Sequence, residues 1–413
     1  MVGRDVIDLG LHRMYKLLAL LEDPQNAMFQ QNPNLKLVHV TGTNGKGSVC
    51  EMVRAGMLGK RVGMFTSPFL MEESDSIKIC SLEGINKCIS NRELASLKVR
   101  VSSLLPEATS FEVLVASALV YFASMALDVL VIEVGMGGLR DATNVFHCKS
   151  IFHCKRISVI TSISFDHEVF LGNTLEAICT EKCGIFANST IAIVNAAIPC
   201  MHVVQNASTI TNSKLCIVDS EADNPPLNGE HQPRLMQIAV QVCVECGAES
   251  QKGTYAENIR SHTHLPGRLE RRTDFPTLPL ILDGAHNAES ATALLQFVTK
   301  QQNVERIIWI MATSQGREEV LVSTLIRNGD TCIATAFPND GWIKSVSTES
   351  LAARMRQIAD IVSEQPNVER AVQSLLAHPP SQDSLVVVAG SLYLVREYLR
   401  FVQHARSDTC QHL

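Results

Sequence analysis

Hydrophobic residues gather in short blocks along this chain, and polar turns separate the blocks. In the first half, four blocks rich in Val and Ile have the length of buried strands: residues 37–40, 129–134, 157–163 and 190–194. Two longer segments, 46–58 and 111–125, show the pattern of helices. Runs that are apolar on both faces and alternate with helices predict a mostly parallel sheet covered on both sides.

The same alternation restarts after Pro266. Strands are predicted at residues 280–282, 307–310, 332–336 and 385–388. Helices are predicted from Ala288 onward, and over residues 351–361 and 368–376. Polar stretches at 219–233 and 247–264 mark the end of the first part. We therefore expect two α/β domains, one over residues 1–264 and a smaller, doubly wound one over 265–413.

Composition narrows the class of protein. The 413 residues include 36 Lys and Arg against 42 Asp and Glu, a net charge of −6, and 46% are hydrophobic. This content supports a large core and excludes global disorder. The acidic balance argues against a nucleic-acid partner, and the lack of an apolar run of about 18 residues argues against a membrane. The N-terminus lacks a secretory signal, and Asp5 and Asp8 argue against a transit peptide, so we expect a cytoplasmic protein, with a mitochondrial fraction as the alternative that stays open.

The 13 cysteines are an odd number scattered through the chain, which is typical of reduced, buried thiols rather than of a disulfide framework. One cluster also permits a zinc interpretation, Cys243 and Cys246 followed by His262 and His264, but the His-x-His spacing disfavours it. A hexapeptide repeat at 146–157 is interpreted as a loop insertion or a duplication without an assigned function.

The strongest local signal is the run GTNGKGS at residues 42–48, between a predicted strand and a predicted helix. Glycines let backbone N–H groups approach phosphate oxygens, the helix N-terminus adds positive charge, and the lysine can reach the terminal phosphates. The spacing differs from the standard G-x4-G-K-[ST], and a glycine-rich turn without a ligand is the competing interpretation. The context favours nucleotide binding by Gly42, Thr43, Asn44, Gly45, Lys46, Gly47 and Ser48.

Polar side chains also lie at the ends of three other predicted strands. Glu133 ends one strand, His167 follows a second, and Asp283 ends a third. Ligands of an open parallel sheet bind at the carboxyl ends of its strands, and a carboxylate there suits Mg²⁺. Taken alone, His167 is equally well a hydrogen-bonded loop residue. The residues themselves thus predict an ATP-using α/β enzyme and no more.

Seven short motifs occur in one order along the chain. They are GTNGKGS at 42–48, TSP at 66–68, EVGMGG with DATN within 133–144, DH with LGNTL within 166–175, EKCGI at 181–185, LPGR at 265–268 and DGAHN at 283–287. This order resembles the Mur ligase superfamily and, within it, the dihydrofolate synthase/folylpolyglutamate synthase family. The resemblance runs from Asp8 to residues 389–392. Residues 7–11 and 227–230 make the chain most similar to the dihydrofolate synthases of fungi.

The resemblance implies an N-terminal P-loop-type ATPase domain and a smaller, Rossmann-like C-terminal domain. It also implies an ATP-dependent ligase in which the carboxylate of 7,8-dihydropteroate attacks the γ-phosphate of ATP. L-glutamate would then attack the acyl phosphate, which gives 7,8-dihydrofolate, ADP and phosphate. Two Mg²⁺ ions would assist, the partners would be these small molecules only, and the protein would be a monomer.

Site residues are implied position by position. Ser67, Glu133 and His167 resemble the ligands of a first Mg²⁺. Lys182 resembles the family's carbamylated lysine, which would help to hold a second Mg²⁺. The remaining implied roles are catalysis for Lys46, His167, Lys182 and His286, ATP contacts for Arg268 and Asp283, and dihydropteroate contacts for Asp8, Leu9, Thr109, Ser110 and Phe111.

The chain also departs from the family pattern. Phe69 replaces a His, Leu139 and Arg140 reverse the usual Arg-Leu order, Leu235 lies in a stretch that lacks an ATP-contacting Asn, and residues 314–318 lack an Asp-Lys-Asp motif. Three functions follow: dihydrofolate synthase, which we favour; folylpolyglutamate synthase or a bifunctional enzyme; and a nucleotide-binding protein with degraded catalysis. The retained phosphate and metal residues favour an active enzyme.

Overall fold

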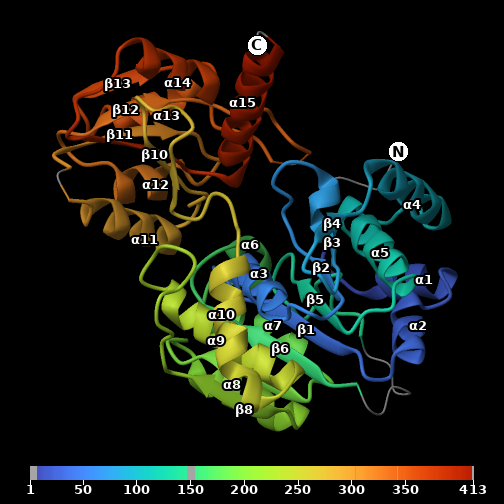
Figure 1. Cartoon of the computed structure of the whole chain (residues 1–413). Helices are drawn as coiled ribbons and strands as arrows, with labels where there is room; N and C mark the ends of the chain where they lie inside the picture. The colour runs from blue at the N-terminus through green and yellow to red at the C-terminus, as the bar shows by residue number, and fades with distance from the viewer. Residues whose placement is uncertain (1–6, 147–153, 303, 342, 412–413) are drawn as a thin grey trace. The chain divides into compact units, whose positions relative to one another are not determined.

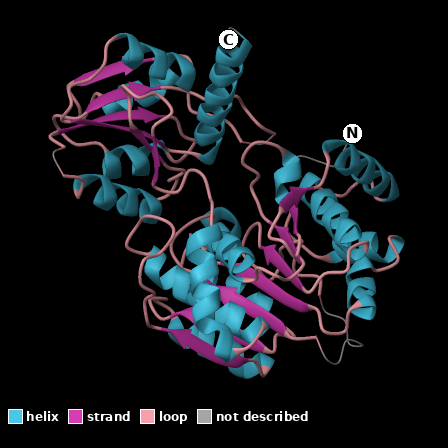
Figure 2. Cartoon of the chain, viewed as in Figure 1, coloured by secondary structure: helices cyan, strands magenta, loops and turns pink. Residues whose placement is uncertain are grey.

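The computed structural model describes residues 7–146, 154–302, 304–341 and 343–411, so the centre of the hexapeptide repeat lies outside the described residues. Contacts divide the chain into two compact units. Unit 1 comprises Met1–Pro226 and His231–His264, and unit 2 comprises Leu227–Glu230 and Leu265–Leu413. Each unit alternates helix and strand around its own sheet (Figures 1 and 2).

The sheet of unit 1 has eight strands among the described residues, in the order β4-β3-β2-β5-β1-β6-β7-β8. Six neighbouring strands run parallel, and β3 and β4 add an antiparallel edge. Their bounds are β1 Lys36–Thr41, β2 Val62–Phe65, β3 Ile77–Cys80, β4 Asn86–Cys88, β5 Val129–Glu133, β6 Arg156–Ile160, β7 Ile191–Asn195 and β8 Lys214–Val218.

Helices cover both faces of this sheet, and its central strands are accordingly buried on both sides. The helices α3, α9 and α10 pack against one another (Figure 1), whereas α1, α2 and α4 pack around α5 over the opposite face. Helix bounds in unit 1 are α1 His12–Leu20, α2 Pro24–Gln31, α3 Lys46–Gly56, α4 Asn91–Leu104, α5 Ser110–Ala123, α6 Glu168–Leu171, α7 Leu175–Cys183, α8 Met201–Thr211, α9 Gln232–Cys246 and α10 Lys252–His262, with 3-10 turns η1 Glu73–Ser76, η2 Gly184–Phe186 and η3 Glu249–Gln251.

Strand register decides which loops meet at the edge of the sheet. The central strand β1 lies between β5 and β6, where Val40 is paired with Glu133 and Thr41 with Ile160. The three carboxyl ends therefore stop at nearly the same level. The loop after Thr41, the carboxylate of Glu133 and the turn after Ile160 are thus neighbours, which is the geometry of an α/β ligand site.

Unit 2 is a smaller α/β layer structure. Its sheet has six strands in the described chain, in the order β13-β12-β11-β14-β10-β9, with only β9 antiparallel. Its strands are β9 Glu270–Arg272, β10 Leu280–Leu282, β11 Arg306–Met311, β12 Thr331–Ala334, β13 Ile361–Glu364 and β14 Ser384–Ala389, and its helices are α11 Ala288–Thr299, α12 Glu318–Leu325, α13 Thr348–Met355, α14 Val368–Ala377 and α15 Leu392–Gln411.

The expected fold class, α/β with mostly parallel sheets, is confirmed, but two expected elements were wrong in extent. The strand expected over 157–163 ends at Ile160, because the next residues turn to support the phosphate loop. The helix expected over 351–361 ends at Met355, and Ile361 begins the edge strand β13. The sequence pattern missed both ends because it carries no information on these tertiary partners.

The polar stretch 247–264 was expected to be a boundary segment, but most of it forms helix α10. Two apolar residues one turn apart, Tyr255 and Ile259, are the only ones buried in this helix, and Ile259 lies against Gly56 of α3. A single buried turn is too little for a periodicity signal. Polar composition concealed a helix that tertiary packing stabilises.

The zinc interpretation gains no support. Cys243 is fully buried, with Sγ 3.8 Å from the carbonyl of Val53. The described residues include no group of three or more His, Cys, Asp and Glu side chains that could hold a metal ion. Likewise, no helix within the described ranges has the length and apolar character needed to cross a membrane.

A buried ion pair lies within α3, the helix that follows the phosphate loop, and its arginine also bonds to the end of α10, so its loss should destabilise unit 1. Arg54 forms two hydrogen bonds with Glu51, at 2.7 and 3.0 Å, and one with the carbonyl of His262, at 2.7 Å. Arg54→Ala leaves the Glu51 carboxylate buried without its cation, so we expect unfolding free energy to fall by about 3–5 kcal/mol.

Urea unfolding followed by circular dichroism should show the loss in a transition that tryptophan fluorescence does not report, since both tryptophans, Trp309 and Trp342, belong to unit 2. The exposed pair Lys16–Glu107 supplies the control, because Lys16→Ala should cost less than about 1 kcal/mol. Equal effects of the two substitutions would contradict the prediction.

Candidate functional site

The phosphate loop after β1 can be built only with glycine at two of its positions. Gly42 has φ +149°, and a Cβ there would lie 1.9 Å from Oγ1 of Thr161. Gly45 has φ +84°, and its Cβ would lie 2.7 Å from Cδ1 of Leu235. A side chain at either position would meet strained backbone and occupied space.

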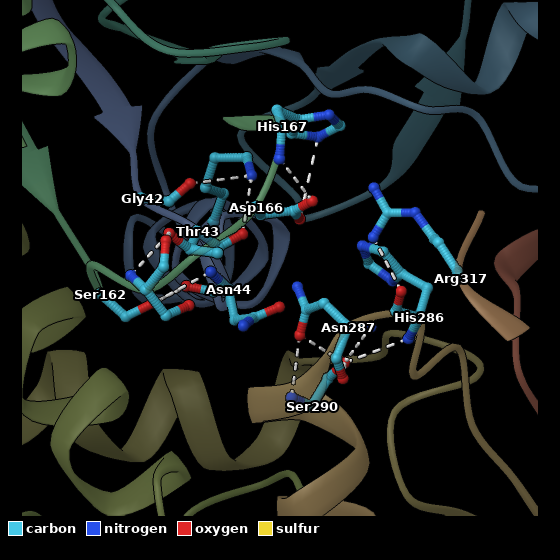
Figure 3. Close-up of polar contacts among 12 residues, drawn as sticks. Gly42, Thr43, Asn44, Ser162, Asp166, His167, His286, Asn287, Ser290 and Arg317 are labelled. Carbon is cyan, nitrogen blue, oxygen red and sulfur yellow. Dashed lines mark hydrogen bonds and ion pairs between the residues drawn. The ribbon is translucent and has the colours of Figure 1, made fainter. Parts of the chain in front are cut away.

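Residues that follow β6 form hydrogen bonds with the backbone of this loop. Asn44 receives a hydrogen bond at its carbonyl from Oγ1 of Thr161 (2.6 Å) and donates its N–H to Oγ of Ser162 (2.9 Å). The N–H of Thr43 donates to the carbonyl of Ser162 at 2.9 Å. Figure 3 shows the contacts of Ser162 with Thr43 and Asn44. The turn after β6 therefore fixes the backbone that would meet a phosphate.

Two lysine amines converge on one oxygen of the loop. Nζ of Lys46 donates to the carbonyl of Gly42 at 3.1 Å and to that of Thr43 at 3.2 Å, and Nζ of Lys182 donates to the same Gly42 carbonyl at 2.9 Å. Lys182 is 4% exposed. Burial, together with the nearby charge of Lys46, lowers the pKa of Lys182 to about 7.

A cavity in unit 1 brings four chain segments together at this point. Gly42, Lys46, Asp166, His167 and Lys182 are among the residues that line it. The backbone N–H of His167 donates to Oδ1 of Asp166 at 2.9 Å, and its Nε2 lies 3.8 Å from Oδ2 (Figure 3). This group of two amines, an imidazole and a carboxylate is suited to a charged ligand.

Next to the loop, Ser67 and Glu133 form an oxygen-rich corner. The N–H of Ser67 donates to Oε2 of Glu133 at 3.3 Å, and Oγ of Ser67 is buried with no hydrogen-bond partner among the described residues. Gly47 leaves room beside the carboxylate, since a Cβ there would lie 3.6 Å from Oε2. A carboxylate and an unsatisfied hydroxyl oxygen suit Mg²⁺, so these residues fit a metal.

The residues expected at the acid substrate are joined by an arginine that sequence reasoning missed. Arg13 is 5% exposed and donates to Oδ2 of Asp8 at 2.7 Å and to both oxygens of Glu112, at 2.9 and 3.0 Å. Glu112 also accepts the N–H of Thr109 at 2.7 Å in the capping box that starts α5. Asp8 and Thr109, far apart in the chain, are thus held together in space.

An aromatic wall lies beside this network. Phe111 packs on Phe65 with ring centres 6.1 Å apart, and a Cβ on Gly135 would lie 2.5 Å from its ring. Leu9 packs against a separate core cluster that includes residues of α7. The side chain of Asp8 remains 48% exposed, although the Arg13 side chain that binds it is buried. The carboxylate of Asp8 is therefore held in place and still accessible to a ligand.

Unit 2 carries the remaining expected residues. Asp283 accepts the N–H of Leu269 at 2.7 Å and that of Ala285 at 2.8 Å. Burial raises the pKa of Asp283 to about 6, an effect that the charge of Arg268 opposes. His286 bonds through Nδ1 to the carbonyl of Gly284 at 2.9 Å. All three expected residues, Arg268, Asp283 and His286, therefore belong to one loop system of this unit.

The departures from the family pattern have identifiable contacts. Leu235 packs on Gly45 and is 3% exposed, so an apolar side chain borders the phosphate loop. Arg140 pairs with Glu181 at 3.1 Å. Arg317, in the stretch that lacks Asp-Lys-Asp, donates to the carbonyl of His286 at 2.7 Å (Figure 3). Nothing in the structure explains the Phe at position 69.

Asp166, Thr161 and Ser162 are site residues that the sequence could have indicated, because they lie beside His167 at the end of a predicted strand. Arg13 carried no such signal, since its partner Glu112 is 99 residues away.

Comparison with known proteins places the whole chain in one family. Residues 40–268 match the Mur ligase middle domain, and residues 268–401 match the dihydrofolate synthetase C-terminal domain. The probable dihydrofolate synthetase of Schizosaccharomyces pombe is 31% identical over 96% of this chain and 99% of its own, and the dihydrofolate synthetase of Saccharomyces cerevisiae is 31% identical over 95% and 98%. The folylpolyglutamate synthase of Mycobacterium tuberculosis, solved with ADP and AMPPCP, superposes with a TM-score of 0.81 at 26% identity, over 95% of both chains.

The buried carboxyl of Asp283 should make the stability of unit 2 depend on pH. Its folded pKa of about 6 lies above the value of about 3.9 expected in the unfolded chain, so the folded state binds the proton more tightly. The resulting stabilisation is complete below pH 4 and is lost as pH rises through 6. Asp283→Asn cannot ionise, so the variant should gain roughly 3 kcal/mol relative to wild type between pH 4 and 7.

Urea unfolding followed by tryptophan fluorescence across this range measures the difference. The amide can accept only one of the two N–H bonds, and this loss should appear as an offset that does not change with pH. A difference between variant and wild type that stays constant across the range would refute the raised pKa.

Proposed function

Because the chain belongs to the dihydrofolate synthase/folylpolyglutamate synthase family of Mur-type ligases, we propose that it joins L-glutamate to 7,8-dihydropteroate using ATP. Membership makes it an ATP-dependent ligase. The single observation that carries the proposal is the cavity at the carboxyl ends of β1 and β6, where Lys46 and Lys182 face Asp166 and His167 beside a phosphate loop. A protein that only bound nucleotide would have no need of the second lysine.

The first step is phosphoryl transfer. The carboxylate of dihydropteroate attacks the γ-phosphate of ATP, a P–O bond forms as the bond to ADP breaks, and an acyl phosphate results. Such transfer depends on positioning and charge neutralisation more than on covalent help from the protein. Lys46 supplies one positive charge, and the backbone N–H groups that open α3 supply partial ones.

We assign the first Mg²⁺ to Ser67 and Glu133, with His167 as a further ligand. Their support is the Oγ of Ser67, which has no hydrogen-bond partner among the described residues, and the bond from the backbone N–H of Ser67 to the Glu133 carboxylate. When bound, the ion neutralises charge that develops on phosphate oxygens. Ser67 and Glu133 hold their oxygens at the loop before any ligand arrives, so little reorganisation is needed.

We assign the second metal position to Lys182 in a carbamylated form. A buried ammonium beside Lys46 would repel a metal ion, whereas a carbamate carries one negative charge shared by two oxygens. Addition of CO₂ requires the neutral amine, which the burial of Lys182 favours. The nearby carbonyl of Gly42 holds the nitrogen in place.

The acid substrate is assigned to the segment around Asp8 and Leu9 together with Thr109, Ser110 and Phe111. The aromatic wall at Phe111 suits a planar ring system, and the half-exposed carboxylate of Asp8 suits its N–H donors.

In the second step the amine of glutamate attacks the acyl phosphate, an amide bond forms, and phosphate leaves as the amine gives up a proton. His286 is the residue of unit 2 that we assign to this stage, and we assign Arg268 and Asp283 to contacts with ATP. Their support is the loop system that holds all three.

Product analysis tests the proposal directly. The purified protein is incubated with ATP, Mg²⁺ and glutamate, plus either 7,8-dihydropteroate or tetrahydrofolate, and ADP and product mass are measured. We expect dihydrofolate from the first acid. Product from tetrahydrofolate alone would replace our assignment with folylpolyglutamate synthase, and no product from either acid would exclude both.

Removal of the central charges should abolish turnover. Lys46→Ala and Glu133→Ala each delete a group that stabilises charge on the transferring phosphoryl, so kcat should fall by roughly 100-fold or more. Lys214→Ala, on the exposed edge strand β8, is the control and should keep the wild-type rate. A near-normal rate in either site variant would refute its role.

Ser67 allows a sharper test of the metal assignment. Because its Oγ has no partner within the described chain, Ser67→Ala removes no hydrogen bond and should leave the melting temperature unchanged. The Mg²⁺ concentration for half-maximal activity should rise roughly tenfold. An unchanged Mg²⁺ requirement would show that Ser67 is not a ligand.

A further inference from the structure

Arg140, one of the two residues in reversed order, connects three separate segments of unit 1. Its Nε donates to Oε2 of Glu181 at 3.1 Å, and its backbone N–H donates to Oε1 of the same carboxylate at 3.0 Å. Its Nη2 donates to the carbonyl of Phe170 at 2.9 Å, and its own carbonyl accepts the N–H of Gly10 at 3.2 Å. One residue thus bonds to the N-terminal segment, to α6 and to α7.

Each of these partners is a close neighbour of a residue assigned to the reaction. Gly10 directly follows Leu9 in the acid-substrate segment. Phe170 lies in the short helix α6, which His167 directly precedes. Glu181 immediately precedes Lys182 in α7. A shift of Arg140 would therefore displace residues next to Leu9, His167 and Lys182, which belong to three parts of the same site.

The loop that carries Arg140 is packed too tightly to take up such a shift elsewhere. The N–H of Leu139 donates to the carbonyl of Glu181 at 2.8 Å, and a Cβ on Gly138 would lie 2.8 Å from the carbonyl of Lys182. The side chain of Leu139, in contrast, is 47% exposed. Of Leu139 and Arg140, only Arg140 directs its side chain to α6 and α7.

The chemistry of the contacts indicates orientation rather than stability as their main effect. The Arg140 side chain is 46% exposed, and ion pairs of that exposure contribute little to unfolding free energy. A planar guanidinium, however, can serve two acceptors in fixed directions at once. The carboxylate of Glu181 and the carbonyl of Phe170 are such a pair, and they come from different helices.

We propose that Arg140 is a positioning residue that holds the acid-substrate segment, α6 and α7 in their relative places for the ligation. The role rests on the proposed function for its catalytic consequence. The side-chain hydrogen bonds of Arg140 go to Glu181 and Phe170 and not to the phosphate loop, so we expect the contacts of that loop with ATP to be kept when Arg140 is replaced. This assigns a use to the reversed Leu-Arg order that the family pattern leaves unexplained.

Steady-state kinetics and hydrogen exchange test the proposal together. Arg140→Ala should raise the KM for dihydropteroate roughly tenfold, while the KM for ATP stays within about twofold and the melting temperature stays near that of wild type. Amide exchange in residues 8–11 and 168–172 should accelerate roughly tenfold. Arg140→Lys should be intermediate in both measurements, because one ammonium can keep the bond to Glu181 but cannot also reach Phe170 in a fixed direction.

Two further variants make the outcome specific. Arg260→Ala is the matched control, since this partly exposed arginine of unit 1 also bonds to a carboxylate, Glu257, and to a backbone carbonyl, that of Asp223, neither of which is assigned to the reaction. It should leave KM and exchange unchanged. The double variant L139R/R140L should behave like Arg140→Ala, because its arginine starts from the exposed position.

Wild-type KM and exchange in Arg140→Ala, or in the double variant, would overturn the proposal. If Arg260→Ala changed the KM and the exchange as much as Arg140→Ala does, the effect would be a general loosening of unit 1, and the proposal would also be overturned. If the wild-type protein ligates neither acid, the proposed function fails, while the exchange data still decide whether Arg140 holds the three segments together.

Discussion

Two lysine amines donate to a single backbone oxygen, and the carboxylates and hydrogen bonds around them in unit 1 compensate for this concentration of positive charge. Lys46 and Lys182 both donate to the carbonyl of Gly42, in a place where one of them is almost fully buried. Like charges at that distance destabilise each other, and the low pKa of Lys182 is the result. The carboxylates of Asp166, Asp141 and Glu181 oppose the effect. A site with this charge pattern is prepared for phosphate oxygens and metal ions before they bind.

The sheet places the site loops at the ends of its strands, and buried networks of hydrogen bonds fix those loops. Asp141 is buried and accepts the N–H of Met136 and both donors of Thr143, whose hydroxyl in turn bonds to His39 of β1. Burial raises the pKa of Asp141, so these donors are needed to satisfy it. The network ties the turn after β5 to the central strand. Through Gly138 that turn lies against the backbone of Lys182, so the sheet and the second lysine are linked.

Much of the architecture could be predicted from the chain because strong apolar runs leave few choices. The strands around residues 37–40, 129–134 and 280–282 formed as expected, since each is buried on both faces. Elements with a weak apolar pattern could not be found in this way. Helix α10 buries Tyr255 and Ile259 and no other residue, and the strand β13 is an exposed edge. Their partners lie far away in sequence, so no local pattern contains them.

For the site, the sequence by itself determined the chemical groups: a glycine-rich loop with Lys46, and carboxylates and a histidine at strand ends. Those groups depend on local backbone geometry, which residue types encode directly. Tertiary structure alone decided that Lys182 would meet Lys46 at one oxygen, that Arg13 would join Asp8 to Glu112, and that Arg140 rather than its neighbour would bridge two helices. Each of these arrangements includes a contact between residues that are distant in the chain, and only strand register and helix packing bring such residues within hydrogen-bonding distance.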